Sequence, residues 1–193
     1  ARRAQMRHVN DIAADLGISD DDLELYGKYK AKVSLNLFHR LKDAPTEKIE
    51  QVFADELENG IGDTGIKRGV IGEIAGEKTQ ITPSEQKVMR AAAHVASQFG
   101  CAVTTHCQLG QMALEQARLL MDNGMKPEKI ILGHLDLAND MDYYQRVLAL
   151  GVNIGFDTCG KVRYLADEVR ADNLAQLGSR GYEKQIVLSP EIS

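Results

Sequence analysis

The sequence predicts an α/β protein in which parallel strands alternate with helices. Short, continuously apolar segments rich in β-branched residues recur along the chain, and amphipathic helical segments separate them. Continuously apolar strands are typical of parallel sheets, because crossover helices cover both faces of such sheets. We expect strands at about 68–75, 101–106, 129–134, 152–158 and 184–189.

Helical patterns fill the intervals between these strands. Apolar residues at helical spacing predict helices at about 46–59, 83–99, 110–123, 139–149 and 163–178. The second helix has the clearest start. Thr82 is suited to cap it, Pro83 suits the first helical position, and Glu85 completes a capping box.

The first 45 residues have a different pattern. Residues 3–42 show apolar residues at helical spacing, interrupted at Gly17 and Gly27, and we predict no strand there. The sequence therefore predicts two parts, a helical segment over 1–45 and an α/β part over 46–193. We expect the helical segment to cover an open edge or end of the sheet.

Composition limits the classes of partner. The 193 residues carry a net charge of −5 and no sustained run of Lys or Arg, which argues against nucleic acid or a membrane surface and favours a small-molecule substrate. No apolar stretch approaches the roughly 18 residues of a membrane span, and the N-terminal segment does not resemble a signal peptide, so we expect a cytoplasmic protein. The three cysteines form no C-x-x-C pair, which indicates neither a disulfide framework nor a thiolate zinc site.

Polar residues recur at the strand ends. Glu73 lies within the first predicted strand, and the others lie at or just past the ends of the following strands: His106, His134, Asp157 and Glu191. Their separations of 33, 28, 23 and 34 residues are close to the roughly 31 residues of one unit in an eight-fold βα barrel. Such a barrel brings these groups to one face, where imidazoles and carboxylates suit a divalent metal such as zinc.

Other interpretations of these residues remain open. A single histidine at a strand end more often has a structural role, and Asp157 in "GFDTCGK" fits a loop cap as well as a catalytic role. The segment "GIGDTG" matches a dinucleotide-binding pattern, but it follows a helix and precedes a strand, which is the reverse of that motif. We interpret it as a turn.

Several segments carry a resemblance to a known family. From about Ile49 to Ser193, "ENGIGDTGIKRGVIGEIAG", "VTTHCQLGQMALEQ", "ILGHLDL", "IGFDTCGK" and "IVLSPEIS" occur in the order of the phosphotriesterase-related branch of the amidohydrolase superfamily. The resemblance implies a TIM-type barrel that holds one or two divalent ions, zinc above all. It implies a metal-dependent hydrolase that acts on an ester, lactone or phosphoester through a metal-bound hydroxide.

The resemblance also implies roles for individual residues. Glu73 would bridge two ions, while His106 and His134 would bind the second ion. Glu191 would take the place of an aspartate that binds metal and accepts a proton. Lys161 is our candidate for substrate binding, because it lies in the loop after the fourth predicted strand.

Two features depart from the family pattern. No H-x-H pair occurs in the 193 residues, although the family's first strand carries one that binds the first ion. The resemblance covers five of eight strands, so we expect a partial barrel whose edges and inner face are open. A homo-oligomer would cover these edges and this inner face. Another chain would supply the missing ligands.

The N-terminal segment resembles a second family. Residues 8–45, with "LELYGKYKAK", resemble the start of formate-tetrahydrofolate ligase, although the phosphate loop of that family is missing. Three hypotheses follow: a metal-dependent hydrolase, a non-catalytic metal-binding or structural fragment, and a module derived from the ligase.

Overall fold

The computed structural model describes residues 7–15, 17–19, 21, 23–25, 31–33, 45–61, 64–74, 76 and 79–189. The chain forms two compact units, Ala1–Pro45 and Thr46–Ser193.

The first unit contains a short helix and a small sheet. The helix α1 (Val9–Asp15) ends before Gly17, whose φ of 68° allows the backbone to turn. The strands β1 (Leu23–Leu25) and β2 (Ala31–Val33) pair in antiparallel orientation. The prediction of helices without strands over residues 3–42 was therefore wrong at both strands. The local sequences Leu-Glu-Leu and Ala-Lys-Val alternate apolar and polar residues, which is compatible with a strand.

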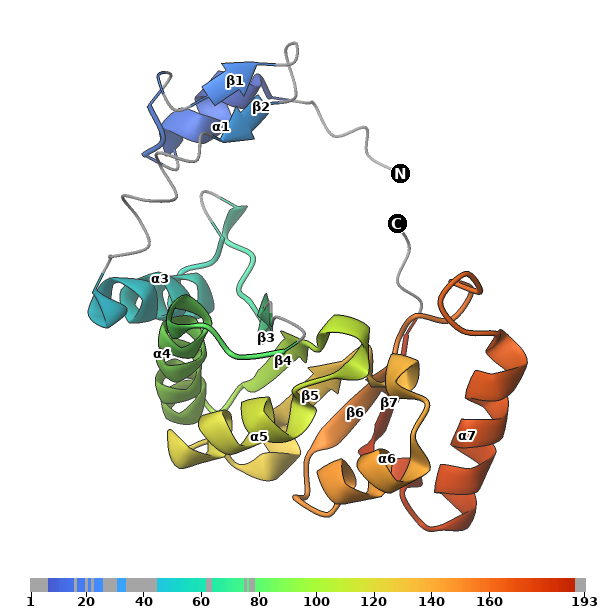
Figure 1. The fold of residues 1–193 in the computed structure, drawn as a ribbon. Coiled ribbons are helices and arrows are strands. Elements are labelled where there is room, and N and C mark those ends of the chain that lie inside the picture. Colours follow the sequence, from blue (N-terminus) through green and yellow to red (C-terminus); the bar gives the residue numbers. More distant parts are fainter. Residues whose placement is uncertain are drawn as a thin grey trace. The chain divides into compact units, whose positions relative to one another are not determined.

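A five-stranded parallel sheet forms the centre of the second unit (Figure 1). Its strands lie in sequence order: β3 (Val70–Ile74), β4 (Ala102–His106), β5 (Ile130–Gly133), β6 (Asn153–Phe156) and β7 (Ile186–Leu188). Every neighbouring pair is parallel. The predicted α/β class and all five predicted strands are confirmed.

One helix precedes β3 and the others connect successive strands of the sheet, and the helices follow one another along its outside (Figure 1). They are α3 (Thr46–Glu58), α4 (Pro83–Phe99), α5 (Ala113–Asp122), α6 (Met141–Leu148) and α7 (Asp167–Ser179). Short 3₁₀ turns lie at Gln108–Gly110, Pro127–Lys129, Leu135–Ala138 and Glu183–Gln185. The predicted capping box at α4 is present. Glu85 N donates to Thr82 Oγ1 over 3.3 Å, and Thr82 N donates to Glu85 Oε2 over 2.6 Å.

The hydrophobic core lies between the sheet and these helices. Leu132 and Ile154 on the central strands have no exposed surface, and the same holds for Ala92 and Ala93 on α4. A fully buried leucine or isoleucine side chain stabilises the folded state by roughly 1.5–3 kcal/mol. The small side chains on α4 let this helix pack closely on the sheet.

The sheet has two edge strands. Among the described residues, β3 and β7 each pair with a strand on one side only. The "GIGDTG" segment lies between α3 and β3, and Gly60 and Gly65 have φ of 104° and 65°, which supports its interpretation as a turn. In the described parts of the chain, no helix has the length and apolar character needed to cross a membrane.

Candidate metal centre

The carboxyl ends of three neighbouring strands bring together residues that the sequence singled out. Glu73 lies in β3, His106 is the last residue of β4, and His134 directly follows β5. His106 pairs with Gly133 in the sheet, so His134 lies one residue beyond its neighbour's end. The alignment of parallel strands thus places the three side chains at one edge.

The three side chains form a compact cluster of ligand atoms. One atom from each of Glu73, His106 and His134 lies within 4.8 Å of the others. Glu73 Oε1 is 3.1 Å from His134 Nε2, and Glu73 Oε2 is 3.7 Å from His106 Nδ1. The two imidazole rings meet edge to face, with centroids 4.5 Å apart. One carboxylate therefore turns an oxygen toward each of two imidazoles.

Asp157 fixes the orientation of the His134 ring. This residue directly follows β6, and its Oδ1 accepts a hydrogen bond from the His134 backbone nitrogen over 2.9 Å. The same oxygen lies 2.8 Å from His134 Nδ1. Because a carboxylate only accepts, Nδ1 carries the proton, and Nε2 is the nitrogen that faces Glu73. Metal-binding histidines almost always donate their other ring N–H in this way, to a carboxylate, a backbone carbonyl or water.

Two glycines allow the carboxylates to approach the strands. A Cβ on Gly155 would lie 2.6 Å from Asp157 Oδ2. A Cβ on Gly133 would lie 3.2 Å from Glu73 Oε1 and 3.3 Å from Asp157 Oδ2. The backbone of β5 and β6 therefore forms a cradle that larger residues would fill.

His106 is held through its side chain and its backbone. Its Nε2 lies 2.7 Å from Gln108 Oε1, so a proton on Nε2 leaves Nδ1 facing Glu73. The buried Gln116 on α5 donates from Nε2 to the His106 carbonyl over 3.1 Å. Gln116 Oε1 in turn accepts from Cys107 Sγ over 3.4 Å. Burial raises the pKa of the Cys107 thiol to about 12, and the protonated thiol donates this hydrogen bond.

The cluster has the donor set that a divalent ion requires. Two neutral imidazoles and one carboxylate suit zinc and related ions. The His134 side chain is 8% exposed, whereas that of Glu73 is 42% exposed, so the cluster is held from the sheet side and open toward solvent. The side chains present therefore fit a metal ion.

A cavity of about 210 Å³ adjoins the cluster. Its lining includes His106, His134, Thr158, Lys161 and Tyr164. Lys161 thus lines the same cavity as two of the clustered side chains. Glu191 lies outside the described residues.

A model of the phosphotriesterase family matches residues 25–193. The chain belongs to this family. The match begins within the first compact unit, upstream of residue 45, where we expected a junction with a second family. It gives no support to the resemblance between residues 8–45 and formate-tetrahydrofolate ligase.

Curated relatives agree with this family membership. The chain is 37% identical over 147 residues to the phosphotriesterase homology protein of Escherichia coli, which covers 76% of this chain and 50% of that protein. It is 33% identical over 174 residues to a phospho-furanose lactonase of Mycoplasmopsis synoviae, covering 84% and 49% respectively. The chain therefore spans about half the length of these phosphotriesterase-family relatives.

Solved structures show that the fold is part of the family's barrel. The Escherichia coli phosphotriesterase homology protein, crystallised with phosphate in its active site, superposes with a TM-score of 0.77 at 36% identity, over 80% of this chain and 53% of that one. A mutant of a Deinococcus radiodurans phosphotriesterase-like lactonase gives a TM-score of 0.74 at 34% identity, over 80% and 49%. The predicted partial TIM-type barrel is confirmed.

Sequence reasoning underestimated Asp157 and overlooked Gln108 and Gln116. Asp157 was assigned a loop cap or a catalytic role, whereas it contacts His134 through two atoms of that residue. Its position at the end of the strand next to that of His134 was the one indication available. No motif marks Gln116, because its contact with His106 depends on how α5 packs on β4.

Proposed function

We propose that this chain provides a metal centre and part of the substrate site of a metal-dependent hydrolase related to the phosphotriesterases. The observation that carries this proposal is the convergence of Glu73, His106 and His134 within 4.8 Å, with His134 oriented by Asp157. The substrate is an ester, lactone or phosphoester. Because the chain spans about half the length of its relatives, the activity of the whole protein is part of the proposal.

We assign the ligand roles as follows. Glu73, His106 and His134 would hold a zinc ion, the histidines through Nδ1 and Nε2 respectively, and Glu73 would also contribute to holding a second ion. A zinc ion bound there would supply a Lewis acid that polarises the substrate and activates water. Glu191 takes the proton from the attacking water and returns it to the leaving group.

The substrate class follows from Lys161 and from the relatives. An ammonium group on a cavity that also contains His106 and His134 suits a substrate with an anionic group beside its reacting carbon or phosphorus. The relative from Mycoplasmopsis synoviae is named a phospho-furanose lactonase. A phosphorylated sugar lactone is therefore the first substrate to test, followed by simple lactones and phosphoesters.

A non-catalytic role is the second candidate. The cluster of Glu73, His106 and His134 supports metal binding, which does not by itself require turnover. In that case the chain would bind metal without turnover.

Hydrolysis assays on the zinc-loaded chain test these proposals. His134→Ala should lower both zinc content and rate, whereas Glu191→Gln should keep most of the zinc and lose rate, because a carboxamide cannot accept the proton. His94→Ala is the matched control, since His94 lies on α4 and pairs with Glu50 on α3 instead. Full zinc content and full activity in both site variants would refute the hydrolase assignment. Zinc binding without activity in the unmodified chain would support the non-catalytic role.

A further inference from the structure

A buried ion pair joins α7 to the loop that follows β5 and His134. Arg170 on α7 has a side chain that is 1% exposed, and Asp136 has no exposed surface. Arg170 Nε donates to Asp136 Oδ2 over 2.6 Å. Arginine and aspartate are almost never buried to this degree unless they are paired.

Thr158 joins this pair through its hydroxyl group. Arg170 Nη2 donates to Thr158 Oγ1 over 2.9 Å, and Thr158 Oγ1 donates to Asp136 Oδ2. Because a guanidinium group only donates, the direction of both bonds is fixed. Arg170 Nη1 also donates to Asp167 Oδ1 over 2.8 Å, which anchors the guanidinium at the start of its own helix. We call the three side chains Asp136, Thr158 and Arg170 the loop network.

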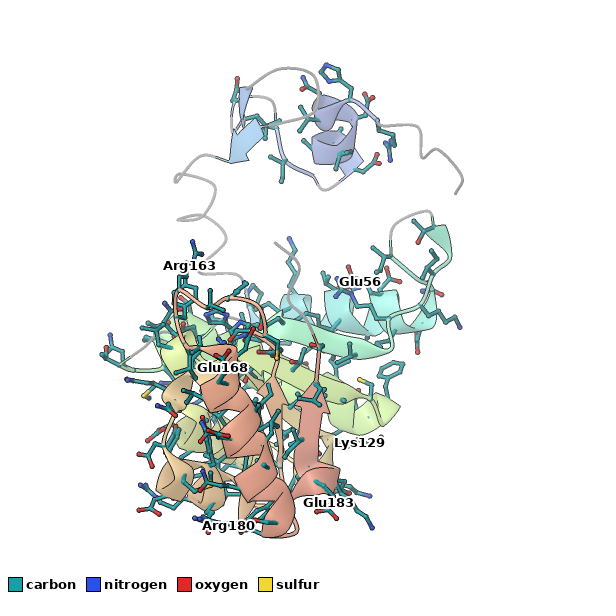
Figure 2. The ribbon with its side chains drawn as sticks, turned by 90° about the vertical axis from the view of Figure 1, so that its right-hand side faces the viewer. Glu56, Lys129, Arg163, Glu168, Arg180 and Glu183 are labelled. Atoms are coloured by element: carbon teal, nitrogen blue, oxygen red, sulfur yellow. The ribbon has the colours of Figure 1, made fainter. Side chains whose placement is uncertain are left out.

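The loop network joins the two segments that present His134 and Asp157. Asp136 lies two residues after His134, and Thr158 directly follows Asp157. Figure 2 faces α7: Glu168 lies at the end of the helix nearer to Arg163, and Arg180 lies at the opposite end. Arg170 lies two residues after Glu168 in α7, and its hydrogen bond to Thr158 joins this half of the helix to the loop after β6.

We propose that the loop network is a positioning device that holds Asp157 against His134. Arg170 ties the loop after β5 to the loop after β6, and the hydroxyl of Thr158 transmits this restraint to its neighbour Asp157. The network thereby sets the orientation of the His134 ring. Its effect on metal affinity rests on the proposed function, but its effect on the contact between Asp157 and His134 does not.

Packing alone does not require this network. Desolvation of two charges offsets much of the attraction between them, so apolar side chains of similar volume would hold α7 on the sheet about as well. The polar groups instead connect Asp136 and Thr158, which lie close in the chain to His134 and Asp157. His134 itself has a φ of 58°, a conformation that non-glycine residues adopt only where the surrounding structure enforces it.

Variants at Thr158 separate positioning from general stability. Thr158→Val keeps the shape of the side chain and removes the hydroxyl, whereas Thr158→Ser keeps the hydroxyl. Gln185→Met is the matched control. Gln185 directly precedes β7, and its Nε2 donates to the Leu148 and Val152 carbonyls, which precede β6, so these bonds lie away from the carboxyl ends of the strands. Thr158→Ala replaces Thr158→Val if the valine variant does not fold.

The direct readout is hydrogen exchange at the His134 backbone amide, which donates to Asp157. Measured by NMR on the metal-free chain, this amide should exchange about 10-fold faster in Thr158→Val relative to the Leu132 amide of the same protein. Thr158→Ser should restore the ratio. The second readout is zinc affinity by competition with a chelator, which should fall roughly 10-fold in Thr158→Val and recover in Thr158→Ser, the lower end of effects seen for groups that orient metal ligands.

The controls decide the interpretation. Gln185→Met should lower the midpoint of urea unfolding and leave both readouts unchanged. An unchanged exchange ratio in Thr158→Val, or an equal change in Gln185→Met, would overturn the positioning role. If the unmodified chain binds no zinc, the proposed function fails, and the exchange ratio still decides the role of the loop network.

Discussion

Asp157 Oδ1 lies within 2.9 Å of both the backbone nitrogen and the ring Nδ1 of His134. One carboxylate oxygen thus holds the main chain and the side chain of a candidate ligand together. His134 directly follows β5 and Asp157 directly follows β6, so the contact depends on the register of these strands and on the turn that follows β5. The consequences of this contact can be measured.

Asp157→Asn is expected to lower the affinity for zinc more than it lowers the stability of the folded chain. The amide keeps the size of the side chain but loses the negative charge that orients His134 and increases its basicity. Zinc affinity should fall by about 10–100-fold. Competition with a chromophoric chelator measures the affinity, and urea unfolding measures stability. Asp140→Asn is the control, because Asp140 caps α6 by accepting a hydrogen bond from Tyr143 N.

Gly155→Ala is expected to displace Asp157. The added Cβ would lie 2.6 Å from Asp157 Oδ2 and 3.2 Å from the Gly133 Cα. Overpacking of this kind costs roughly 1–3 kcal/mol of the free energy of unfolding, and zinc affinity should fall as well.

Gly178→Ala is the control for Gly155→Ala, because it adds the same methyl group at a site that has room for it. Gly178 lies within α7, and a Cβ there would meet no atom within 4 Å. Alanine in a helix is favoured over glycine by about 0.5–1 kcal/mol. This variant should therefore be more stable and should bind zinc normally. Equal zinc affinity in both glycine variants would contradict the role of the cradle.

Lys161→Met is expected to change substrate preference. The specificity constant kcat/KM should fall by about 10-fold or more for a phosphorylated lactone, because a hydrogen bond to a charged group contributes about 1.5–3 kcal/mol. A neutral lactone should lose little, and zinc content should stay constant. Lys129→Met is the control, since Lys129 precedes β5 and therefore lies at the other end of the strands. An equal loss of kcat/KM for both substrates would show that Lys161 does not bind the anionic group of the substrate.

Stability should fall with rising pH above about 9. The pKa of the buried Cys107 thiol is raised from 9.0 to about 12, because burial disfavours the thiolate. Between these values the unfolded chain loses a proton that the folded chain retains, so ionisation favours unfolding. This group lowers the free energy of unfolding by about 1 kcal/mol per pH unit in that range. Urea unfolding at pH 8 and pH 10 measures the effect, and Cys107→Ala should reduce the slope.

The fold of the second unit was predictable because local and tertiary preferences agree. Ile130 and Leu132 belong to an apolar, β-branched segment that a parallel sheet buries, and Thr82, Pro83 and Glu85 mark the start of α4 through local bonds. The small sheet of the first unit was not predictable in this way. Its strands have three residues each, and so short an alternation also fits one turn of a helix.

The site was predictable to the extent that strand ends define it. Glu73, His106 and His134 converge because parallel strands align their carboxyl ends. Arg170 illustrates the limit, because the segment "DEVRADN" has the composition of an exposed helix, although this side chain is buried. Its burial depends on Asp136, 34 residues earlier in the chain, and that pairing exists only in the folded state.

Zinc content per chain tests the central claim most directly. Elemental analysis after incubation with zinc and removal of unbound ions should give at least one ion per unmodified chain. The double variant His106→Ala and His134→Ala should give none, because a single carboxylate remains from the cluster. An unmodified chain that retains no zinc, or a double variant that retains as much as the unmodified chain, would contradict the assignment of the metal centre.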